Sequence, residues 1–375
     1  FIQKLRENHN VLLRASEQPT DVGFSWLPLK CSTRSPRSLP VHLFRGTLAS
    51  QAAYPPWLPQ RILSNPCLHI FMVEIASSSQ DSLLAKVVLV TGCSSGLGQA
   101  LATCLHSQTT PDGRTLYKVY ATARRLKTLE PLADLGISTL ALDVGSEASV
   151  KEAVATVLSQ EERLDVLVNN AGISKFGPLA EQPLSEVTAV FDTNVMGVLR
   201  MTQAVVPSMA ARGGGLVVNI GSVSAWLATP YAGAYSASKA ALHALSDSLR
   251  LELRPFNIQV TTVTAGAITS SFSNNAEAGQ SGERYERPGS LYRAHAPSIR
   301  ARARMSQNSK GVQPASQVAA RIAGVINAAT APGAKPPPAW FLAAGGALKL
   351  WVLGLLQKVL GRALDSTIAG QFGLA

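Results

Sequence analysis

The chain has 375 residues, of which 46% are hydrophobic and 15% charged, as in a folded protein with one large domain or two small ones. Its net charge is +11, and residues 1–71 supply much of it with eight basic against three acidic side chains. The remainder is mildly basic and carries no motif that reads nucleic acid, which argues against a nucleic-acid partner. The four cysteines form no C-x-x-C pair, which argues against a disulfide framework and against a metal site.

Residues 1–71 differ from the rest of the chain in their scattered prolines, poor periodicity and few acidic residues. The first methionine is Met72. Two interpretations compete for this segment: a targeting leader, or an upstream stretch included in the reading frame, with Met72 as the true start. We favour the second interpretation. In either case we expect the segment to lie outside the folded domain, which we assign to residues 72–330.

From Lys86 onward, short β-branched apolar runs alternate with helical stretches. The expected strands lie in KVVLVTG, YKVYATARR, STLALDV, LDVLVNNAG, GLVVNIGS and IQVTTVTAG. Strands that alternate with helices favour crossover units and a parallel sheet buried on both faces. We therefore predict an α/β fold, a single doubly wound Rossmann-type parallel sheet with helices on both faces. Ligands of such sheets bind beyond the carboxyl ends of the strands.

A glycine-rich turn, VTGCSSGLGQAL, joins the first expected strand to the first helix. Glycine allows a sharp turn and the close approach of a pyrophosphate to the helix N-terminus, where unpaired N–H groups favour an anion. This placement favours dinucleotide binding. Cys93 within the turn is either a reactive thiol or a small residue that fits, and we favour the second. The residues assigned to the cofactor here are Gly92, Ser94, Ser95, Gly96, Leu97 and Gly98.

The end of the second strand indicates which dinucleotide is bound. A carboxylate there would accept from the ribose 2′-hydroxyl of NAD, but this chain has Arg124 and Arg125. Two guanidinium groups suit a 2′-phosphate, so we predict NADP(H). Asp143 ends the third strand, where it would bind the adenine edge. Asn170, Ala171 and Gly172 end the fourth strand, where they would wall the adenine and ribose.

Tyr235 and Lys239 are one helical turn apart, and Ser222 ends the fifth strand thirteen residues earlier. Residues at i and i+4 share one helix face, so the phenol and the ammonium can point into one site. A phenol has a pKa of about 10, and a neighbouring cation would lower it toward the working range. We therefore expect Lys239 to tune Tyr235 and to reach the nicotinamide ribose.

These motifs together resemble the short-chain dehydrogenase/reductase family over about residues 86–270. They are T-G-x-x-x-G-x-G from Thr91 to Gly98, N-N-A-G from Asn169 to Gly172, Asn194 in FDTNVMGV, Ser222, and Y-x-x-x-K from Tyr235 to Lys239. The resemblance implies a catalytic tetrad. Tyr235 would be the general acid in reduction and the base in the reverse reaction, and Ser222 would bind the substrate carbonyl. Lys239 would lower the pKa of Tyr235. Asn194 would complete a proton relay through a helix distortion and a water.

The chain departs from the family after the sixth strand, where Ala265-Gly266 replaces the usual Pro-Gly pair. Ile268 and Ser270 still fit the positions that contact the nicotinamide amide and the phosphates. A variable lid is expected over about residues 271–312. Six arginines between Glu283 and Arg304 would clamp an anionic substrate, lie against an anionic membrane, or form a solvated helix face.

We expect residues 331–375 to form a proline-rich break and a C-terminal apolar helical tail. Residues 339–356 are apolar apart from Lys349, which is close to the length that spans a bilayer, although the glycines and the lysine weaken that interpretation. Contact with a membrane or lipid droplet, and burial against the domain or a partner subunit, both remain open. A homo-oligomer is common in the family.

This layout resembles the NADPH-dependent 1-acyldihydroxyacetone-phosphate reductases, and the resemblance implies a lipid-like carbonyl substrate. Retinol- or steroid-type dehydrogenases and ketoreductases of secondary metabolites share much of it. A non-catalytic, membrane-attached dinucleotide-binding scaffold is a further alternative, but all four tetrad positions are filled. We expect a location on the cytoplasmic side of the endoplasmic reticulum or a lipid droplet, or otherwise in the cytoplasm.

Overall fold

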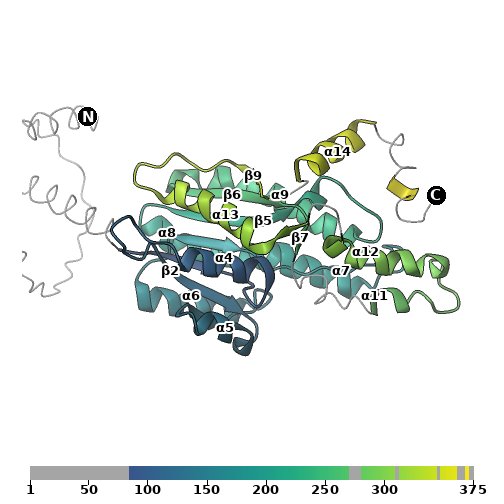
Figure 1. Cartoon of the computed structure of the whole chain (residues 1–375), viewed down its shortest axis with the longest axis horizontal. Helices are drawn as coiled ribbons and strands as arrows, with labels where there is room; N and C mark the ends of the chain where they lie inside the picture. The colour runs from purple at the N-terminus through teal and green to yellow at the C-terminus, as the bar shows by residue number, and fades with distance from the viewer. Residues whose placement is uncertain (1–83, 270–279, 309–311, 344–346, 361–367, 371–375) are drawn as a thin grey trace, which may run out of the picture. The chain divides into compact units, whose positions relative to one another are not determined.

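The computed structural model describes residues 84–269, 280–308, 312–343, 347–360 and 368–370, and within them seven parallel strands form one sheet (Figure 1). All of these residues belong to the second of two units of the chain, residues 66–375. The expected leader, residues 1–71, lies outside the described residues, and so does Ser270. The strands are β1 Lys86–Val90, β2 Tyr117–Ala123, β3 Ser138–Ala141, β4 Val166–Asn169, β5 Gly215–Ser222, β6 Ile258–Ala265 and β9 Trp340–Leu342.

The strands are apolar on both faces, as a parallel sheet covered by helices requires. Successive side chains of a strand point to opposite faces. In β1, Val88 and Val90 join one hydrophobic cluster, whereas Val87 and Leu89 join the other. The sheet therefore lies between two apolar layers.

Helices cover each of these layers. On one face α4 (Gly96–His106) lies beside α13 (Ala315–Thr330), and their leucine, valine and isoleucine side chains pack on the sheet (Figure 1). On the other face lie α6 (Glu147–Glu161), α8 (Gly197–Ala211) and α9 (Gly233–Glu252). Short elements complete this part of the fold: η1 Leu126–Leu129, α5 Glu130–Ala133, α7 Leu184–Phe191, η2 Asp192–Met196, η3 Val223–Ala225 and η4 Arg254–Phe256.

The strand order is β3-β2-β1-β4-β5-β6-β9, so the chain reverses direction across the sheet between β1 and β4. The carboxyl ends of the strands at such a reversal form the crevice where doubly wound sheets bind ligands. The glycine-rich turn and the NNAG segment follow β1 and β4, and both therefore lie at this crevice. The predicted Rossmann-type architecture is confirmed.

The lid region begins and ends at a second, two-stranded sheet. β7 (Ile268–Thr269) pairs in parallel with β8 (Gln313–Pro314). Between them the described part of the chain contains α11 (Gln280–Glu283), η5 (Arg293–His295) and α12 (Ala296–Asn308). Because β7 directly follows the end of β6, the lid is anchored close to the carboxyl edge of the main sheet.

The structure corrects one part of the expected helical tail. Trp340, Phe341 and Leu342 form β9 and pair with Thr262–Thr264 of β6, so these residues complete the sheet. Trp340 and Phe341 are partly buried, and Phe341 packs against the core, whereas Leu342 is exposed at this edge of the sheet. α14 (Ala347–Leu360) follows, and at 1.5 Å per residue its 14 residues are shorter than a bilayer core of about 30 Å. No helix within the described residues is long and apolar enough to cross a membrane.

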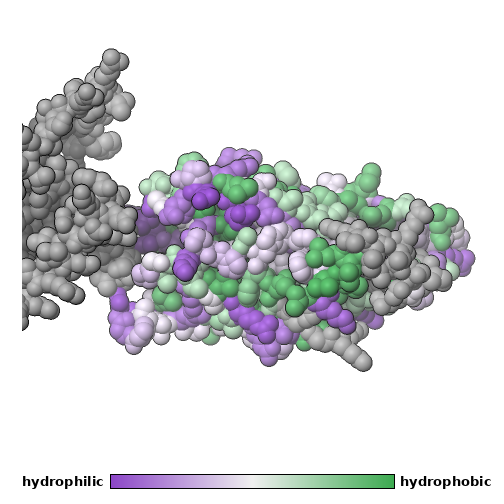
Figure 2. Space-filling model, turned by 90° about the horizontal axis from the view of Figure 1, so that it is seen from above, coloured by the Kyte–Doolittle hydropathy of each residue, from purple (hydrophilic) through white to green (hydrophobic). Residues whose placement is uncertain are grey.

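α14 has one face against the domain and another exposed. Gly354 lies so close to the backbone of Trp226 that an added methyl group would meet the Trp226 carbonyl at 2.7 Å. Leu348, Val352 and Leu356, which are spaced one turn apart, are exposed. Figure 2 looks onto this side and shows an apolar patch over α14. The interpretation of the tail as a membrane contact stays a prediction.

The glycine-rich turn predicts a test of the fold. A methyl group on Gly98 would overlap with the Gly92 carbonyl oxygen and the Asn170 side-chain amide, so Gly98→Ala should destabilise the protein by about 1–3 kcal/mol. Gly324→Ala is the matched control, because this α13 glycine has open space around its Cα. There alanine should stabilise the helix by about 0.5–1 kcal/mol. Chemical denaturation measures both, and equal shifts would contradict the prediction.

Candidate active site

α9 presents a polar face to the carboxyl end of β5. On this helix Lys239 and His243 follow Tyr235 at intervals of four residues, and Ser238 follows it by three, so these side chains point to the same side. Lys239 is buried, and its Nζ donates a 2.8 Å hydrogen bond to the Ile220 carbonyl of β5. The same Nζ lies 5.8 Å from the centre of the Tyr235 ring. The predicted proximity of Tyr235 and Lys239 is confirmed.

Ser222, the last residue of β5, faces Tyr235 as predicted. Its hydroxyl is hydrogen-bonded to the Tyr235 phenol and accepts a 3.1 Å bond from the Ser224 backbone N–H. The backbone N–H of Ser222 donates to His243 Nε2 at 3.3 Å. Ser222 is therefore held at both its backbone and its side chain, with the hydroxyl directed at the phenol.

Burial has the largest effect on the pKa of Tyr235. Burial raises the pKa of the phenol above its ordinary value, whereas the hydrogen bond from Ser222 and the charge of Arg302 oppose this rise. Burial dominates here, and the groups that oppose it are Ser222 and Arg302. The phenol therefore stays protonated at neutral pH. The expectation that Lys239 lowers this pKa stays a prediction. Arg302 was not singled out by the sequence.

Burial also affects the ammonium group of Lys239 by lowering its pKa to about 8. The group still carries a positive charge in most molecules at pH 7. A methyl group built on Gly172 would lie 3.7 Å from Lys239 Nζ and 3.2 Å from Asn194 Oδ1. Only glycine therefore leaves open space between these two polar groups.

Asn194 lies in η2, a π-helical turn between α7 and α8, which confirms the expected helix distortion. Its side-chain amide exchanges two hydrogen bonds with the Ile173 backbone, at 2.8 and 2.9 Å. Its Nδ2 also donates to Ser238 Oγ at 3.0 Å. Asn194 thus connects the segment after β4 to α9. The expected water-mediated relay is not tested by these contacts.

The glycine-rich turn fits a dinucleotide. Gly92 has φ +71°, and a methyl group there would lie 2.7 Å from the Ala171 Cα. Gly96 has φ +62° and begins α4. Ser95, the N-cap of α4, makes no capping hydrogen bond, which leaves the first N–H groups of the helix to bind an anion. Ser94 is exposed beside them, whereas Leu97 is buried in the core.

Thr91 is a site residue that the prediction missed, although it precedes the first glycine of the motif. Its hydroxyl oxygen accepts from the backbone N–H groups of Asn170 and Ala171, at 3.0 and 2.9 Å. Asn170 Nδ2 donates in turn to the carbonyls of Thr91 and Gly92. The Asn170 amide group therefore holds the two loops together, a use that differs from the predicted wall of the adenine pocket.

Arg124 and Arg125 follow β2 and are both exposed, and neither forms an ion pair within the described part of the chain. Their guanidinium groups are therefore available to an external anion. Asp143 is also exposed, although its Oδ1 accepts a 2.9 Å bond from the Gly145 backbone N–H. Ile268 lies in β7 at the start of the lid.

Cys93 is an inert core residue, as expected. It is buried, and its thiol donates to the Val90 carbonyl at 3.2 Å. Burial raises the pKa of the thiol to about 12. Because a thiol of this pKa is protonated at neutral pH, the site has no nucleophilic thiolate at this position.

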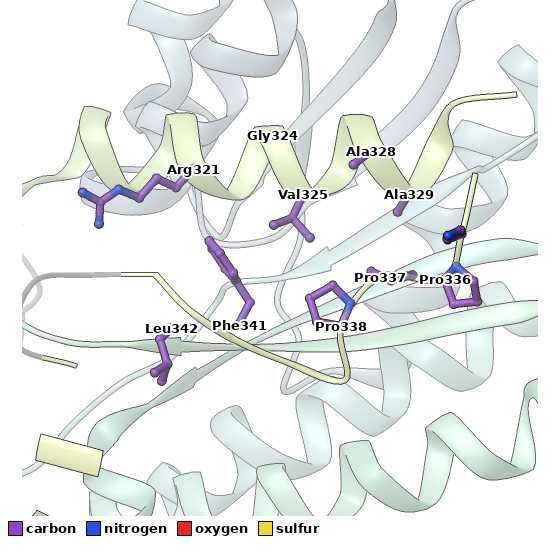
Figure 3. Close-up of a pocket in the computed structure, with 11 residues that line it drawn as sticks. Arg321, Gly324, Val325, Ala328, Ala329, Pro336, Pro337, Pro338, Phe341 and Leu342 are labelled. Carbon is purple, nitrogen blue, oxygen red and sulfur yellow. The ribbon is translucent and has the colours of Figure 1, made fainter. Parts of the chain in front are cut away.

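A separate groove of about 540 Å³ lies between α13 and the segment before and within β9 (Figure 3). Its lining residues include Val325, Ala328 and Phe341, with Arg321 and Lys335 as the charged ones. None of its lining residues belongs to the predicted site, so we do not assign the reaction to it.

Comparison with known proteins agrees with this geometry. Residues 86–281 match the family model described as short chain dehydrogenase. A short-chain dehydrogenase structure from Streptomyces avermitilis is 31% identical in sequence. It aligns with a TM-score of 0.59 over 76% of this chain and 98% of that chain.

Two curated relatives differ in their substrates. The estradiol 17-beta-dehydrogenase 1 of Rattus norvegicus is 42% identical over 207 residues, which cover 53% of this chain and 58% of that protein. The NADPH-dependent 1-acyldihydroxyacetone phosphate reductase of Schizosaccharomyces pombe is 38% identical over 185 residues, 49% of this chain and 60% of that protein. The match to each of these curated relatives thus spans less than two thirds of its length.

The buried His243 predicts how stability depends on pH. Burial, and secondarily the charge of Lys239, lower the pKa of its imidazole from 6.5 to about 3, and no described residue bonds to Nδ1. The unfolded state therefore binds more protons between these pH values. This contribution to stability is complete above pH 6.5 and is lost as the pH falls toward 3.

As the pH is lowered from 6.5 to 4, the free energy of unfolding should fall less in His243→Phe than in the natural protein. The difference should be on the order of 3 kcal/mol. Urea denaturation at a series of pH values measures this. Other titrating groups are common to both proteins, so the difference isolates His243. Parallel curves for the two proteins would show that His243 is not the source. At pH 7 the variant should be less stable, because the Ser222 N–H loses its acceptor.

Proposed function

The chain belongs to the short-chain dehydrogenase family, and we propose that it is an NADP(H)-dependent oxidoreductase that reduces the carbonyl group of a lipid. One observation carries the proposal: the hydrogen bond between Ser222 and Tyr235, next to Lys239, at the edge of the sheet that also holds the glycine-rich turn. A protonated phenol, a hydroxyl and an ammonium are the groups that a carbonyl oxygen needs as it gains negative charge.

Tyr235 acts as the general acid. Its raised pKa keeps the proton on the phenol, so the group can donate that proton to the substrate oxygen. A bound nicotinamide would supply the hydride to the carbonyl carbon. As the pKa of the oxygen rises during the reduction, proton transfer from the phenol becomes favourable. In the reverse direction the phenolate would accept the proton from an alcohol.

The neighbouring residues position the substrate and stabilise charge. The Ser222 hydroxyl binds the carbonyl oxygen together with the phenol. Lys239, fixed by its bond to Ile220, keeps a positive charge near the ring and stabilises the phenolate that remains after proton transfer. Asn194 holds the Ile173 segment and, through Ser238, the catalytic helix. It therefore acts as a positioning residue, and a further role in a proton relay through water is part of the proposal.

The cofactor preference rests on the end of β2. Arg124 and Arg125 are exposed there and form no ion pair within the described residues, and two guanidinium groups complement a 2′-phosphate. The NADPH dependence printed for the Schizosaccharomyces pombe relative supports the same preference. Gly92, Gly96 and the N-terminus of α4 would hold the pyrophosphate.

We propose 1-acyldihydroxyacetone phosphate as the substrate, on the support of the relative that reduces it and of the arginines in the lid. Reversible oxidation of a steroid or retinoid alcohol is the second candidate, and the 42% identity to an estradiol dehydrogenase favours it. Assembly into a homo-oligomer, contact with a membrane or lipid droplet, and a location at the endoplasmic reticulum or in the cytoplasm stay predictions from the sequence.

The proposed role of Tyr235 gives a direct test. Tyr235→Phe removes the transferable proton but keeps the ring, so kcat for carbonyl reduction should fall by about 10³-fold. The Kd for NADPH, measured by fluorescence, should change by less than about twofold. Tyr120→Phe is the control, because this tyrosine bonds to Gln160 and Glu161 on α6, and it should keep its turnover.

The same assay separates an enzyme from a scaffold. NADPH consumption should appear with at least one of a panel of acyldihydroxyacetone phosphate, long-chain ketones, retinal and steroids. Tight NADPH binding without turnover across the panel would support a non-catalytic dinucleotide-binding protein. A Tyr235→Phe variant as active as the natural protein would remove the phenol from the mechanism.

The cofactor assignment has its own test. Arg124→Ala should raise the Kd for NADPH by about 10-fold or more and leave that for NADH almost unchanged, since only NADPH carries the 2′-phosphate. Arg114→Ala is a surface control, because Arg114 pairs with Asp112 on a loop before β2, and it should change neither constant. Equal weakening of both cofactors by Arg124→Ala would show that the NADP(H) preference is wrong.

A further inference from the structure

The six arginines of the lid differ in their surroundings. Three form ion pairs with carboxylates: Arg284 with Glu186, Arg287 with Glu181, and Arg300 with Glu286. Arg293 and Arg304 are exposed to solvent. Arg302 remains, partly buried on α12. The first three have their counter-ions within the protein, so they attach the lid to the domain or to itself.

Arg302 has no carboxylate partner among the described residues. Its Nε and Nη2 both donate to the hydroxyl of Thr229, at 3.1 and 3.0 Å. Its guanidinium carbon lies 5.1 Å from the centre of the Phe176 ring. A guanidinium has five N–H donors. The Thr229 hydroxyl and the Phe176 ring are both uncharged, so neither neutralises the positive charge of Arg302. A cation removed from water without a counter-ion is costly.

The position of Arg302 is fixed by packing. Ala303 on the same helix is buried against Phe176 and Ala232, and Ile299 is fully buried one turn earlier. Phe176 comes from the segment after β4, and Thr229 from the loop between Ser222 and Tyr235. The guanidinium group therefore lies between two loops at the carboxyl edge of the sheet, on a rigid support.

The Arg302 guanidinium is close enough to the Tyr235 phenol for their charges to interact. The charges of Arg302 and Tyr235 affect each other, since each group shifts the titration of the other. Burial lowers the pKa of Arg302 to about 10, so the guanidinium is still charged at pH 7. A fixed cation thus stands beside the catalytic phenol on the lid side, separate from the buried Lys239.

We propose that Arg302 binds an oxyanion of the substrate, a phosphate or carboxylate that lies a few bonds from the reacting carbonyl. The inference rests on the proposed reductase function and names its substrate class: acidic carbonyl compounds instead of neutral steroids or retinoids. The substrate oxyanion supplies the counter-ion that Arg302 lacks, and two of its oxygens fit the fork of the guanidinium. The Thr229 hydroxyl holds that fork in place.

The experiment compares two substrates that differ only in the charged group. The full chain with NADPH is assayed on 1-hexanoyl-dihydroxyacetone phosphate and on 1-hexanoyl-dihydroxyacetone. The natural protein should prefer the phosphorylated ketone in kcat/KM by about 30-fold or more. Arg302→Met should abolish this preference through a higher KM for the phosphorylated ketone, with little change for the neutral one. Arg302→Lys should keep part of the preference, because it keeps the charge but loses the fork.

Arg304→Met is the matched control, because Arg304 is an exposed arginine two residues further along α12. It should keep the full preference for the phosphorylated ketone. Thermal unfolding of each variant reports whether the fold is intact, and the retained turnover of the neutral ketone gives the same information for the active site.

Binding without turnover provides a second readout. Calorimetric titration with hexyl phosphate, hexanoate, inorganic phosphate and hexanol should show that the two acidic hexyl ligands bind more tightly than hexanol. Arg302→Met should remove this difference. If inorganic phosphate bound as tightly as hexyl phosphate, the site would recognise a free ion and not the charged group of a substrate. That result would overturn the proposal.

The remaining outcomes separate this inference from the reductase function. Turnover of both ketones without preference would reject the role of Arg302 and leave the reductase function standing. Arg302-dependent binding of hexyl phosphate with no turnover of any carbonyl would support the oxyanion site and reject the reductase function. If Arg302→Met slows both ketones equally and shifts the pH profile of kcat, Arg302 acts on Tyr235 alone, and the oxyanion site is wrong.

Discussion

The attachment of α9 to the end of β5 is the constraint on which the candidate active site depends. Lys239 donates one of its three N–H groups to the Ile220 carbonyl. His243, one helical turn further along α9, accepts from the Ser222 backbone N–H. These two bonds hold the helix at a fixed distance and rotation relative to the strand. Tyr235 and Ser222 meet because both bonds are made. The buried lysine is thus a structural connection as well as a charge.

A second set of bonds connects this helix to the cofactor side of the crevice. Asn194 joins Ser238 on α9 to the Ile173 backbone, and Asn170 joins the same segment after β4 to the glycine-rich turn. The π-helical turn around Asn194 directs its amide toward α9, where a regular helix would turn it elsewhere. The glycine-rich turn, the NNAG segment and the catalytic helix therefore form one connected unit.

Much of this site could be predicted from the sequence, because its motifs follow strands whose apolar runs are easy to recognise. The spacing of Tyr235 and Lys239 is local, and the parallel order of the strands brings Ser222 and the glycine-rich turn to the same edge. Arg302 could not be distinguished from its five neighbours, since burial and pairing depend on the folded lid, and the partners of Arg284 and Arg287 lie on the distant segment around Glu181 and Glu186. β9 was missed because an edge strand and a membrane-contacting stretch are equally apolar.

Two cations with different surroundings lie near Tyr235, and the difference suggests a separate role for each of them. Lys239 is buried and bonded to a backbone carbonyl, so its position cannot respond to the substrate. Arg302 belongs to the lid, where Thr229 and Phe176 hold it without a counter-ion. Burial alone would make the phenol a weaker acid, and the positive charge of Arg302 opposes this effect. A substrate oxyanion bound to Arg302 would cancel that opposition while the substrate is in place. The phenol would then hold its proton more firmly until negative charge develops on the carbonyl oxygen, which is the moment at which reduction needs the proton.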